Sequence, residues 1–256
     1  MNKRIGIAGI GGRMGRLLAE EITAAGETLV GGIERSGVTA PAGAVLFEDI
    51  AALARASDVV LEFTHASTAI PHARAIAESG TGWVLGTTGL SATDEAAVAE
   101  AAKRAPVVFA ANFSPGVNLV LALAEQMARA LPAEQYDAEI LEMHHRQKVD
   151  APSGTAVAMG RAVAKGRSGD LDNLKEGGRD GHTGARRTGA IGFAALRGGQ
   201  VVGEHTLLFA AATEHIALTH RAFDRRAFAT GAVRAAQWVS GRKPGLYSMM
   251  DVLGMR

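Results

Sequence analysis

The 256-residue sequence contains no cysteine, which excludes disulfide bonds, a thiolate metal site and a cysteine nucleophile. The net charge is also small, because 27 Lys and Arg residues nearly balance 26 Asp and Glu residues and leave a net charge of +1. Such a balance argues against a broad nucleic-acid-binding or polybasic membrane surface. No apolar run reaches the roughly 18 residues that a membrane-spanning helix requires. We therefore expect a cytoplasmic protein whose partners are small molecules.

Glycine, by contrast, is abundant, with 32 residues in a chain that is 47% hydrophobic and only 5% aromatic. The glycines follow no three-residue repeat, which excludes collagen, and the apolar content excludes a disordered linker. The composition indicates a globular protein with many tight turns or close backbone approaches. A chain of this length typically forms one or two domains.

Short apolar strands alternate with helical patterns in the first half of the chain. This alternation is typical of a parallel sheet with helices on both faces. Ser91-Ala-Thr-Asp94 resembles a capping box that begins a helix, and Pro71 must lie in the first turn of its helix. The predicted strands are Arg4–Ala8, Thr28–Ile33, Asp58–Phe63, Trp83–Gly86 and Pro106–Ala110, and the predicted helices are Arg16–Ala25, Ser67–Glu78 and Ser91–Arg104.

The pattern changes after about Phe113, and the second part indicates an antiparallel or mixed sheet with two helices. Arg197-Gly198-Gly199-Gln200 has the composition of a hairpin turn and predicts that the strands on either side of it pair directly. The predicted helices are Val117–Leu131 and Thr155–Ala164, the strands are Asp137–Met143, Ile191–Leu196, Val201–Phe209 and His215–Thr219, the polar stretch Lys165–Thr188 is a loop, and a last helix covers Arg226–Ser240.

A glycine-rich segment, Gly9-Ile10-Gly11-Gly12-Arg13-Met14-Gly15, lies between the first predicted strand and the first predicted helix. Glycines let a backbone turn tightly and approach a pyrophosphate, and the helix N-terminus presents N–H groups to the phosphates. Met14 fills the third glycine position of the usual G-x-G-x-x-G, and the set can equally be read as Gly9, Gly12 and Gly15. The position at the first strand–helix junction favours a dinucleotide-binding loop over a simple tight turn.

Glu34 and Arg35 end the second predicted strand, about 20 residues past the glycine loop. An acid at this place accepts hydrogen bonds from the adenosine ribose of NAD, whereas an arginine pairs with the 2′-phosphate of NADP. Because the chain carries both, either NADH or NADPH is compatible with the sequence.

Two further segments follow predicted strands and should lie at the same edge of the sheet, where ligands bind in folds of this type. Their hydroxyls and backbone amides suit a nicotinamide ribose or carboxamide. The residues predicted to bind the cofactor here are Gly86, Thr87, Thr88, Ala110, Ala111, Asn112 and Phe113.

The densest chemistry lies in a loop that follows a predicted strand and contains His144, His145, Arg146 and Lys148. Catalytic groups are often carried by loops on a rigid scaffold. The crowding of cations should favour proton release from Lys148 and the histidines, so that Lys148 could donate a proton near neutral pH. A paired His144 and His145 could also bind a metal, but neighbouring residues in an extended chain point opposite ways and further ligands are not spaced nearby. We therefore expect no metal.

Ser153, Gly154 and Thr155 come next and begin a predicted helix. Either hydroxyl can cap the helix, and Gly154 lets a ligand approach the backbone amides. A basic loop beside a helix N-terminus indicates an acidic substrate, such as a dicarboxylate. The whole pattern predicts an α/β fold, with a Rossmann-like dinucleotide-binding domain (1–113 and 226–256) and a smaller α+β substrate-binding domain with a mixed sheet (114–225).

At this segment the chain resembles the dihydrodipicolinate reductase family, also called the 4-hydroxy-tetrahydrodipicolinate reductase family. Several motifs occur in the family's order and cover almost the whole chain. They are Gly9–Gly15, Gly86-Thr-Thr-Gly89, Ala110-Ala-Asn-Phe-Ser114, His144-His145-Arg-Gln-Lys148-Val-Asp-Ala-Pro-Ser153-Gly154-Thr155-Ala, Gly181-His-Thr-Gly184, Ile191-Gly-Phe193, Val202-Gly-Glu-His205 and Gly231-Ala-Val-Arg-Ala.

The resemblance implies NADH- or NADPH-dependent reduction of a cyclic imine-type dicarboxylate to tetrahydrodipicolinate, a step toward diaminopimelate and lysine. It implies that His144 acts as acid/base, that Lys148 donates a proton, and that His145, Gly154 and Thr155 contact the substrate carboxylates. It also implies a homotetramer built through the sheet of the second domain. The implied dinucleotide contacts are Gly9–Met14, Glu34, Arg35, Gly86–Thr88 and Ala110–Phe113.

One departure concerns the cofactor site, where the chain has Glu62 and His65 at positions at which relatives often carry Asp and Arg. Two rival interpretations stay open at this point. An NAD(P)-dependent dehydrogenase of another small amino or dicarboxylic acid would not need the His144–Thr155 loop, and an idle dinucleotide-binding sensor would not need His144 and Lys148.

Overall fold

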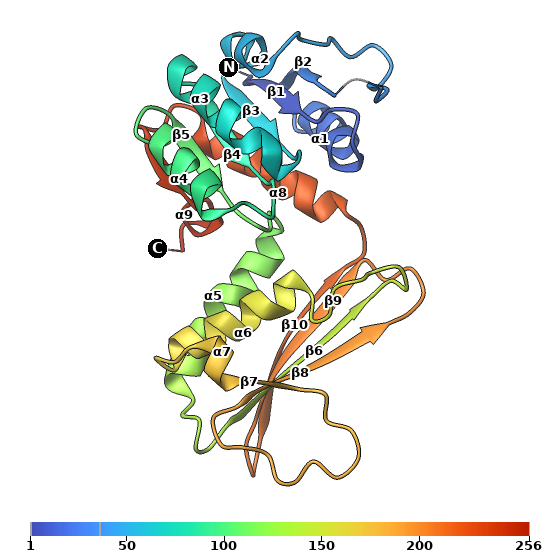
Figure 1. Cartoon of the computed structure of the whole chain (residues 1–256), viewed down its shortest axis with the longest axis vertical. Helices are drawn as coiled ribbons and strands as arrows, with labels where there is room; N and C mark the ends of the chain where they lie inside the picture. Colours follow the sequence, from blue (N-terminus) through green and yellow to red (C-terminus); the bar gives the residue numbers. More distant parts are fainter. Residues whose placement is uncertain (1, 36, 256) are drawn as a thin grey trace. The chain divides into compact units, whose positions relative to one another are not determined.

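The computed structural model describes residues 2–35 and 37–255, and the chain divides into two compact units (Figure 1). The first unit comprises the residues up to Pro115 together with those from Arg226 onward, and the second comprises Gly116–Arg225. No helix in the described part of the chain is long and apolar enough to cross a membrane.

The first unit is built on a parallel sheet in which, among the described residues, six strands follow the order β11-β5-β4-β3-β1-β2. The chain order reverses beside β1, which pairs with β2 on one side and β3 on the other. The strands are β1 (Arg4–Ala8), β2 (Thr28–Ile33), β3 (Val59–Glu62), β4 (Gly82–Leu85), β5 (Pro106–Phe109) and β11 (Gly245–Tyr247). The helices are α1 (Arg13–Ala24), α2 (Ile50–Ala56), the 3₁₀ turn η1 (Ala66–Thr68), α3 (Ala69–Ser79), α4 (Ala92–Ala101), α8 (Arg226–Val239) and α9 (Met249–Leu253).

Helices cover both faces of this sheet, which confirms the predicted arrangement. Successive residues of a strand point to opposite faces, and in β3 Val59 and Leu61 pack in the cluster that includes α1 and α8, whereas Val60 packs with α2, α3 and α4. Short runs that are apolar at every position are therefore what such a sheet needs.

Local signals located the elements of the first unit well. Ser91 and Asp94 form the predicted capping box of α4, and Pro71 lies in the first turn of α3. The sequence reading missed α2, β11 and α9. These elements are short, and they pack against a sheet that local patterns do not reveal, so their own periodicity is too brief to identify them.

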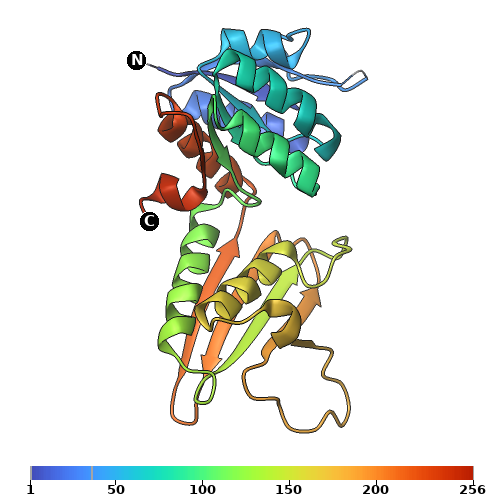
Figure 2. The same cartoon turned by 60° about the vertical axis from the view of Figure 1, so that its left-hand side comes forward.

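The second unit contains a mixed sheet with the strand order β10-β9-β6-β8-β7 in its described residues. β6 pairs in parallel with β8 and antiparallel with β9, and α5 and α6 pack on one face through the apolar core that includes Val120, Met159 and Leu207 (Figure 2). The elements are α5 (Pro115–Ala130), β6 (Asp137–His144), α6 (Gly154–Gly166), α7 (Leu171–Leu174), β7 (Lys175–Gly177), β8 (Ile191–Arg197), β9 (Gly203–Ala210) and β10 (His215–Ala222).

The predicted hairpin at Arg197–Gln200 is wrong. β6 lies between β8 and β9, since Ala138 of β6 is the register partner of Ile191 on one side and of Phe209 on the other. The glycines of the connection instead cross the end of β6, where Gly198 N–H donates to the His144 carbonyl at 2.9 Å and Arg146 N–H donates to the Gly199 carbonyl at 3.3 Å. A turn signal shows that the chain changes direction and does not show whether another strand inserts.

The stretch Lys165–Thr188 is also more ordered than predicted, because it contains the end of α6, all of α7 and β7. Asp170 caps α7 through its side chain. The exposed remainder is tied to the sheet by Arg186, whose guanidinium donates to Glu139 and Asp137 and to the carbonyls of Ala138 and Ala190 at 2.6–2.9 Å.

Candidate active site

The glycine loop of the first unit folds as a close-packed strand-to-helix turn. Gly9 has φ +85°, its N–H donates to the Ile33 carbonyl at 2.9 Å, and Gly12 N–H donates back to the Gly9 carbonyl at 3.1 Å. A Cβ at Gly15 would lie 2.1 Å from the Gly9 carbonyl oxygen, so only glycine lets α1 begin this close to β1. Within the described residues, no side chain caps α1 at Gly12, which leaves its first-turn amides directed at an incoming anion.

Glu34 directly follows β2, and its side chain contacts this loop. Its carboxylate accepts hydrogen bonds from Gly11 N–H at 2.7 Å and from Arg35 N–H at 2.9 Å, whereas the Arg35 side chain is exposed. Arg16 fixes the other side of the loop, because its guanidinium donates to the Gly11 carbonyl at 3.1 Å and the Thr39 carbonyl at 2.7 Å. An acid and an exposed arginine therefore flank the helix N-terminus, as the sequence predicted.

The segments after β4 and β5 present less side-chain chemistry than we expected. Thr87 is buried and its hydroxyl accepts from Thr64 N–H at 3.1 Å, while Thr88 is exposed. The Asn112 side-chain oxygen accepts from Ser114 N–H at 2.8 Å. The Phe113 ring is buried, and its centroid lies 5.5 Å from that of Phe63. Ala110 and Ala111 offer backbone only, so a ligand here would meet mainly backbone groups and Thr88.

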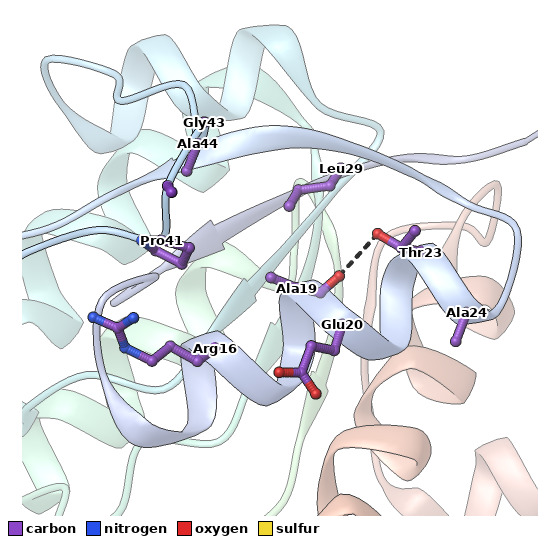
Figure 3. Close-up of a pocket in the computed structure, with 10 residues that line it drawn as sticks. Arg16, Ala19, Glu20, Thr23, Ala24, Leu29, Pro41, Gly43 and Ala44 are labelled. Atoms are coloured by element: carbon purple, nitrogen blue, oxygen red, sulfur yellow. Dashed lines mark hydrogen bonds between the residues drawn. The ribbon is translucent and has the colours of Figure 1, made fainter.

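A hollow of about 680 Å³ lies elsewhere in the first unit, between α1 and the segment 41–44 (Figure 3). It is lined by side chains that include Ala19, Glu20 and Leu29. The residues predicted to bind cofactor are absent from its lining within the described part of the chain. Arg16 reaches across its edge and belongs to the contacts of the glycine loop described above.

In the second unit, the carboxylate of Glu142 organises the predicted catalytic loop. Glu142 is 1% exposed and accepts hydrogen bonds from His144 Nδ1 at 2.5 Å, Ser153 N–H at 3.0 Å and both terminal nitrogens of Arg197 at 2.8 Å. Burial alone would raise the pKa of Glu142, but the hydrogen bonds from Arg197, His144 and Ser153 outweigh it and hold the pKa below its ordinary value. The ionised carboxylate thus fixes one nitrogen of His144 and the start of α6 together.

His144 has a second aromatic neighbour in His205 of β9. The two rings lie 5.0 Å apart in an edge-to-face arrangement, and both residues are buried. Burial lowers the pKa of His205 to about 4, with a smaller effect from His144. Burial is also the main cause that lowers the pKa of His144, and it prevails over the opposing influence of Glu142. The predicted easier proton release from His144 is therefore confirmed in direction, although desolvation matters more than the neighbouring cations.

Lys148 is placed by a turn in which its N–H donates to the His145 carbonyl at 3.1 Å. Its ammonium lies 2.9 Å from the carboxylate of Asp150, and the pKa of Asp150 is lowered mainly by that hydrogen bond. His145 Nδ1 is buried and finds no hydrogen-bond partner among the described residues. The loop thus combines an ammonium held by one carboxylate with a polar ring nitrogen that a ligand could engage.

The helix α6 begins at the predicted segment, where Ser153 has a different structural role from Gly154 and Thr155. Ser153 is 2% exposed, and its hydroxyl caps Ala156 N–H at 3.2 Å and lies 3.0 Å from His205 Nε2. Gly154 is exposed, and a Cβ built on it would meet no atom of the described residues within 4 Å. The surface that can receive an anion is therefore the first turn of α6 at Gly154 and Thr155, and Ser153 supports it from beneath.

No catalytic or binding role was predicted from the sequence for Glu142, Arg197 or His205. Alternation could have found two of them, because Glu142 and His144 share the buried face of β6 and His205 lies on the buried face of β9. Glu142 is the register partner of His205. A charged residue at an inward position of an alternating strand is therefore the signal for the buried cluster, whereas Arg197 is recognisable only once β8 is known to pair with β6.

The buried cluster predicts how stability depends on pH. An unfolded histidine takes up a proton near pH 6.5, but His205 in the folded protein does so only near pH 4. The folded state should thus lose about 3 kcal/mol as the pH falls through this interval, and the lowered pKa values of His144 and His220 add to the same loss. Urea unfolding of wild type and His205→Gln at pH 7.5 and 4.5 would measure it. The variant should lose less stability on acidification, whereas His215→Gln, at an exposed site on β10, should behave as wild type; equal losses in all three would contradict the prediction.

Comparison with known proteins covers both units. The model of the dihydrodipicolinate reductase N-terminus matches residues 3–113, and that of the dihydrodipicolinate reductase C-terminus matches residues 116–253. The chain is 67% identical over 255 residues to 4-hydroxy-tetrahydrodipicolinate reductase of Granulibacter bethesdensis, covering 99% of this chain and 97% of the relative. It is 62% identical over 252 residues to the enzyme of the same name from Acidiphilium cryptum, covering 98% of each.

A solved structure has the same fold. Dipicolinate-bound dihydrodipicolinate reductase from Paenisporosarcina sp. TG-14 superimposes with a TM-score of 0.81 at 23% identity, over 98% of this chain and 99% of that one. The family models together span nearly the whole chain, and the curated relatives match it end to end at high identity. The chain therefore belongs to the dihydrodipicolinate reductase family.

Proposed function

We propose that this chain reduces 4-hydroxy-tetrahydrodipicolinate, or its dehydrated form dihydrodipicolinate, to tetrahydrodipicolinate in diaminopimelate and lysine biosynthesis. The observation that carries the proposal is the Glu142 cluster, which holds His144 and the N-terminus of α6 together beside Lys148. A dehydrogenase of another small acid would not need this assembly, and a sensor would not need a protonating group. The relatives from Granulibacter bethesdensis and Acidiphilium cryptum are named as reductases of the same substrate.

The glycine loop fits a nicotinamide dinucleotide. The close approach that Gly15 permits and the first-turn amides of α1 leave backbone donors for a pyrophosphate. Gly9–Met14 would hold the pyrophosphate, Glu34 and Arg35 the adenosine ribose, and Gly86–Thr88 and Ala110–Phe113 the nicotinamide half. When bound, the cofactor supplies the hydride that the reduction consumes.

The second unit would bind the substrate through its carboxylates. The first turn of α6 at Gly154 and Thr155 offers backbone N–H groups and a positive dipole end, and Lys148 adds a positive charge. His145 Nδ1, buried without a described partner, is a further donor or acceptor for the same ligand. Ser153, which we also predicted to bind the substrate, has its hydroxyl between Ala156 and His205, and we propose that it supports the site rather than contacting the ligand through that hydroxyl.

The 4-hydroxy form first loses water to give the conjugated C=N system of the dehydrated form, and reduction of that system then adds one hydride and one proton. The hydride forms a C–H bond on the ring, and the electron pair displaced from the π system must then accept the proton. We assign this proton to Lys148, which then takes up a new proton from solvent. Because Glu142 holds Nδ1 of His144, Nε2 is the ring nitrogen left for proton exchange.

The direct test is an assay with the condensation product of pyruvate and aspartate semialdehyde, followed by the loss of reduced-nicotinamide absorbance. Oxidation of NADH or NADPH that depends on this substrate would support the proposal. A chain that oxidises neither cofactor with it, yet reduces a different small oxo or imino acid, would establish the rival dehydrogenase instead.

We further infer that both cofactors are used and that Glu34 and Arg35 divide the recognition. Glu34→Ala should weaken NADH binding about tenfold, because it removes the carboxylate that meets the ribose hydroxyls. Arg35→Ala should weaken NADPH binding by about tenfold and leave NADH binding within about twofold, because only NADPH carries the phosphate. Titration of cofactor fluorescence measures both, with Arg55→Ala, an exposed arginine on α2, as the control. Equal effects of Arg35→Ala on the two cofactors would contradict the assignment.

We also infer a homotetramer assembled through the second unit's sheet. Its uncovered face carries the exposed side chains of Leu141 on β6 and Leu196 on β8, at 45% and 48% exposure, and apolar residues on one sheet face favour burial against another chain. Sedimentation equilibrium should give four times the 26.5 kDa chain mass, and a monomer at micromolar concentration would refute the inference.

A further inference from the structure

A second buried carboxylate lies in the first unit, at Glu62, the last residue of β3. Its side chain is fully buried. One oxygen accepts from Thr64 Oγ1 at 2.7 Å, Thr68 Oγ1 at 3.0 Å and His72 Nδ1 at 2.8 Å, and the other accepts from Trp83 Nε1 at 2.9 Å. A buried carboxylate is costly unless its oxygens are satisfied. These donors come from the loop after β3, from α3 and from β4, so the carboxylate ties three elements to one point.

The loop after Glu62, which includes Phe63 and Thr64, packs against two predicted cofactor segments, at Gly9 and at Gly86. On one side, a Cβ at Gly9 would lie 3.0 Å from the Phe63 carbonyl oxygen and 3.2 Å from Thr64 Cγ2. On the other side, a Cβ at Gly86 would lie 2.2 Å from the Phe63 ring. Both glycines therefore pack directly against Phe63 or Thr64, so the place of this loop limits how both cofactor segments can lie.

Thr64 links the carboxylate to the second cofactor segment. Its hydroxyl contacts Glu62 at 2.7 Å and lies 3.3 Å from Thr87 Oγ1, and its N–H donates to the same Thr87 oxygen at 3.1 Å. A chain of hydrogen bonds therefore runs from the buried carboxylate to Thr87, next to the exposed Thr88. Loss of the Thr64 hydroxyl would break the link between Glu62 and Thr64, while the Thr64 N–H stays on Thr87 and three other donors stay on Glu62.

We propose that Glu62 is a positioning residue for the dinucleotide site: through Thr64 it sets the loop between the Gly9–Met14 and Gly86–Thr88 segments, without touching the cofactor itself. The inference rests on the proposed assignment of those segments to the dinucleotide. It explains why a charged side chain is buried at the end of β3, where an apolar residue would pack without the need for four donors.

The first test is Thr64→Val, which removes one hydroxyl and keeps the branched shape. The dissociation constant for NADH, measured by fluorescence titration, should rise about five- to twentyfold. The KM for the cofactor should rise with it, while kcat at saturating cofactor stays within about threefold, because the catalytic groups of the second unit are unchanged.

The matched control is Thr81→Val in the same unit. Thr81 is also buried, and its hydroxyl donates to the Ala54 carbonyl at 2.9 Å, but it precedes β4 and so lies at the opposite edge of the sheet from Thr87. This variant should lose thermal stability to a similar extent and bind NADH as wild type does. A general structural role for Thr64 predicts instead that the two variants behave alike.

A spectroscopic signature follows from the contact between Glu62 and Trp83. In a Trp238→Phe background, Trp83 is the only tryptophan. Glu62→Gln should change its emission and weaken NADH binding at least as much as Thr64→Val, whereas Thr64→Val alone should leave the emission unchanged. If Glu62→Gln fails to fold, the Thr64 and Thr81 pair still decides the question.

The outcomes separate the inference from the function on which it rests. Weak NADH binding by Glu34→Ala together with wild-type binding by Thr64→Val would overturn the positioning role alone. Wild-type binding by both would overturn the assignment of the cofactor site, and the positioning role with it. A similar fall in cofactor affinity in Thr64→Val and Thr81→Val would also overturn the inference.

Discussion

Lys148→Ala should lower turnover by about 10³–10⁴-fold, the upper part of the roughly 10²–10⁴-fold range that a positioned acid contributes. The ammonium lies on a loop tied to the Glu142 cluster and is held 2.9 Å from Asp150, so its place is fixed before substrate binds. Steady-state kinetics with saturating NADH and substrate measures the effect. NADH binding should persist, because the glycine loop and Glu34 belong to the other unit.

Lys148→Arg distinguishes the proton from the charge. Arginine keeps a positive charge for the carboxylates but does not release its proton in proteins. This variant should bind a dicarboxylate such as dipicolinate and still turn over slowly. Lys165→Ala, an exposed lysine on α6 paired with Glu125, serves as the control and should retain full activity. Normal turnover by Lys148→Ala would remove Lys148 as the proton donor.

His144→Ala should cost about 10²–10³-fold in kcat, the share of a single acid/base group. Burial lowers the pKa of His144, so the ring is neutral at physiological pH and can take up and return a proton. The pH–rate profile is the informative measurement, since the acidic limb of the wild-type profile should change in the variant. A profile and rate close to those of wild type would show that His144 is not part of the chemistry.

Glu142→Gln tests how that ring is held. The amide can still accept one hydrogen bond, but it cannot receive His144, Ser153 and Arg197 together as the carboxylate does. Activity should fall, and the acidic limb should move to lower pH because the negative charge that favours protonated His144 is lost. His215→Ala, on the exposed side of β10, should leave both rate and profile unchanged.

The first unit was largely predictable because its strands and helices alternate along the chain. The strands β1 to β5 pair with neighbours that the βαβ pattern already implies, so the glycine loop and Glu34 could be placed from local signals alone. The second unit was not, because β6 inserts between β8 and β9, which follow each other in the sequence. Local turn chemistry at Gly198 and Gly199 cannot report a strand that comes from much earlier in the chain.

The residues of the candidate site also differ in how far the sequence predicts them. His144, Lys148 and Gly154 lie in one contiguous motif and were found by reading it. Arg197 and His205 reach the same cluster only through β6 pairing with β8 and β9. Glu142 lies within the motif but was overlooked, because its meaning comes from being buried and meeting partners distant in sequence. Pairing between distant strands, and the burial that results from it, are what sequence patterns leave out.

The central place of β6 also has a consequence for synthesis of the protein. During translation β6 leaves the ribosome before β8 and β9, and both of its edges remain unpaired until those strands follow. A strand with two open edges is prone to pair with other chains. The nascent second unit should thus be vulnerable to aggregation until about the time β9 is made, and chains that end before Gly203 should be captured by chaperones or degraded rather than accumulate as folded fragments.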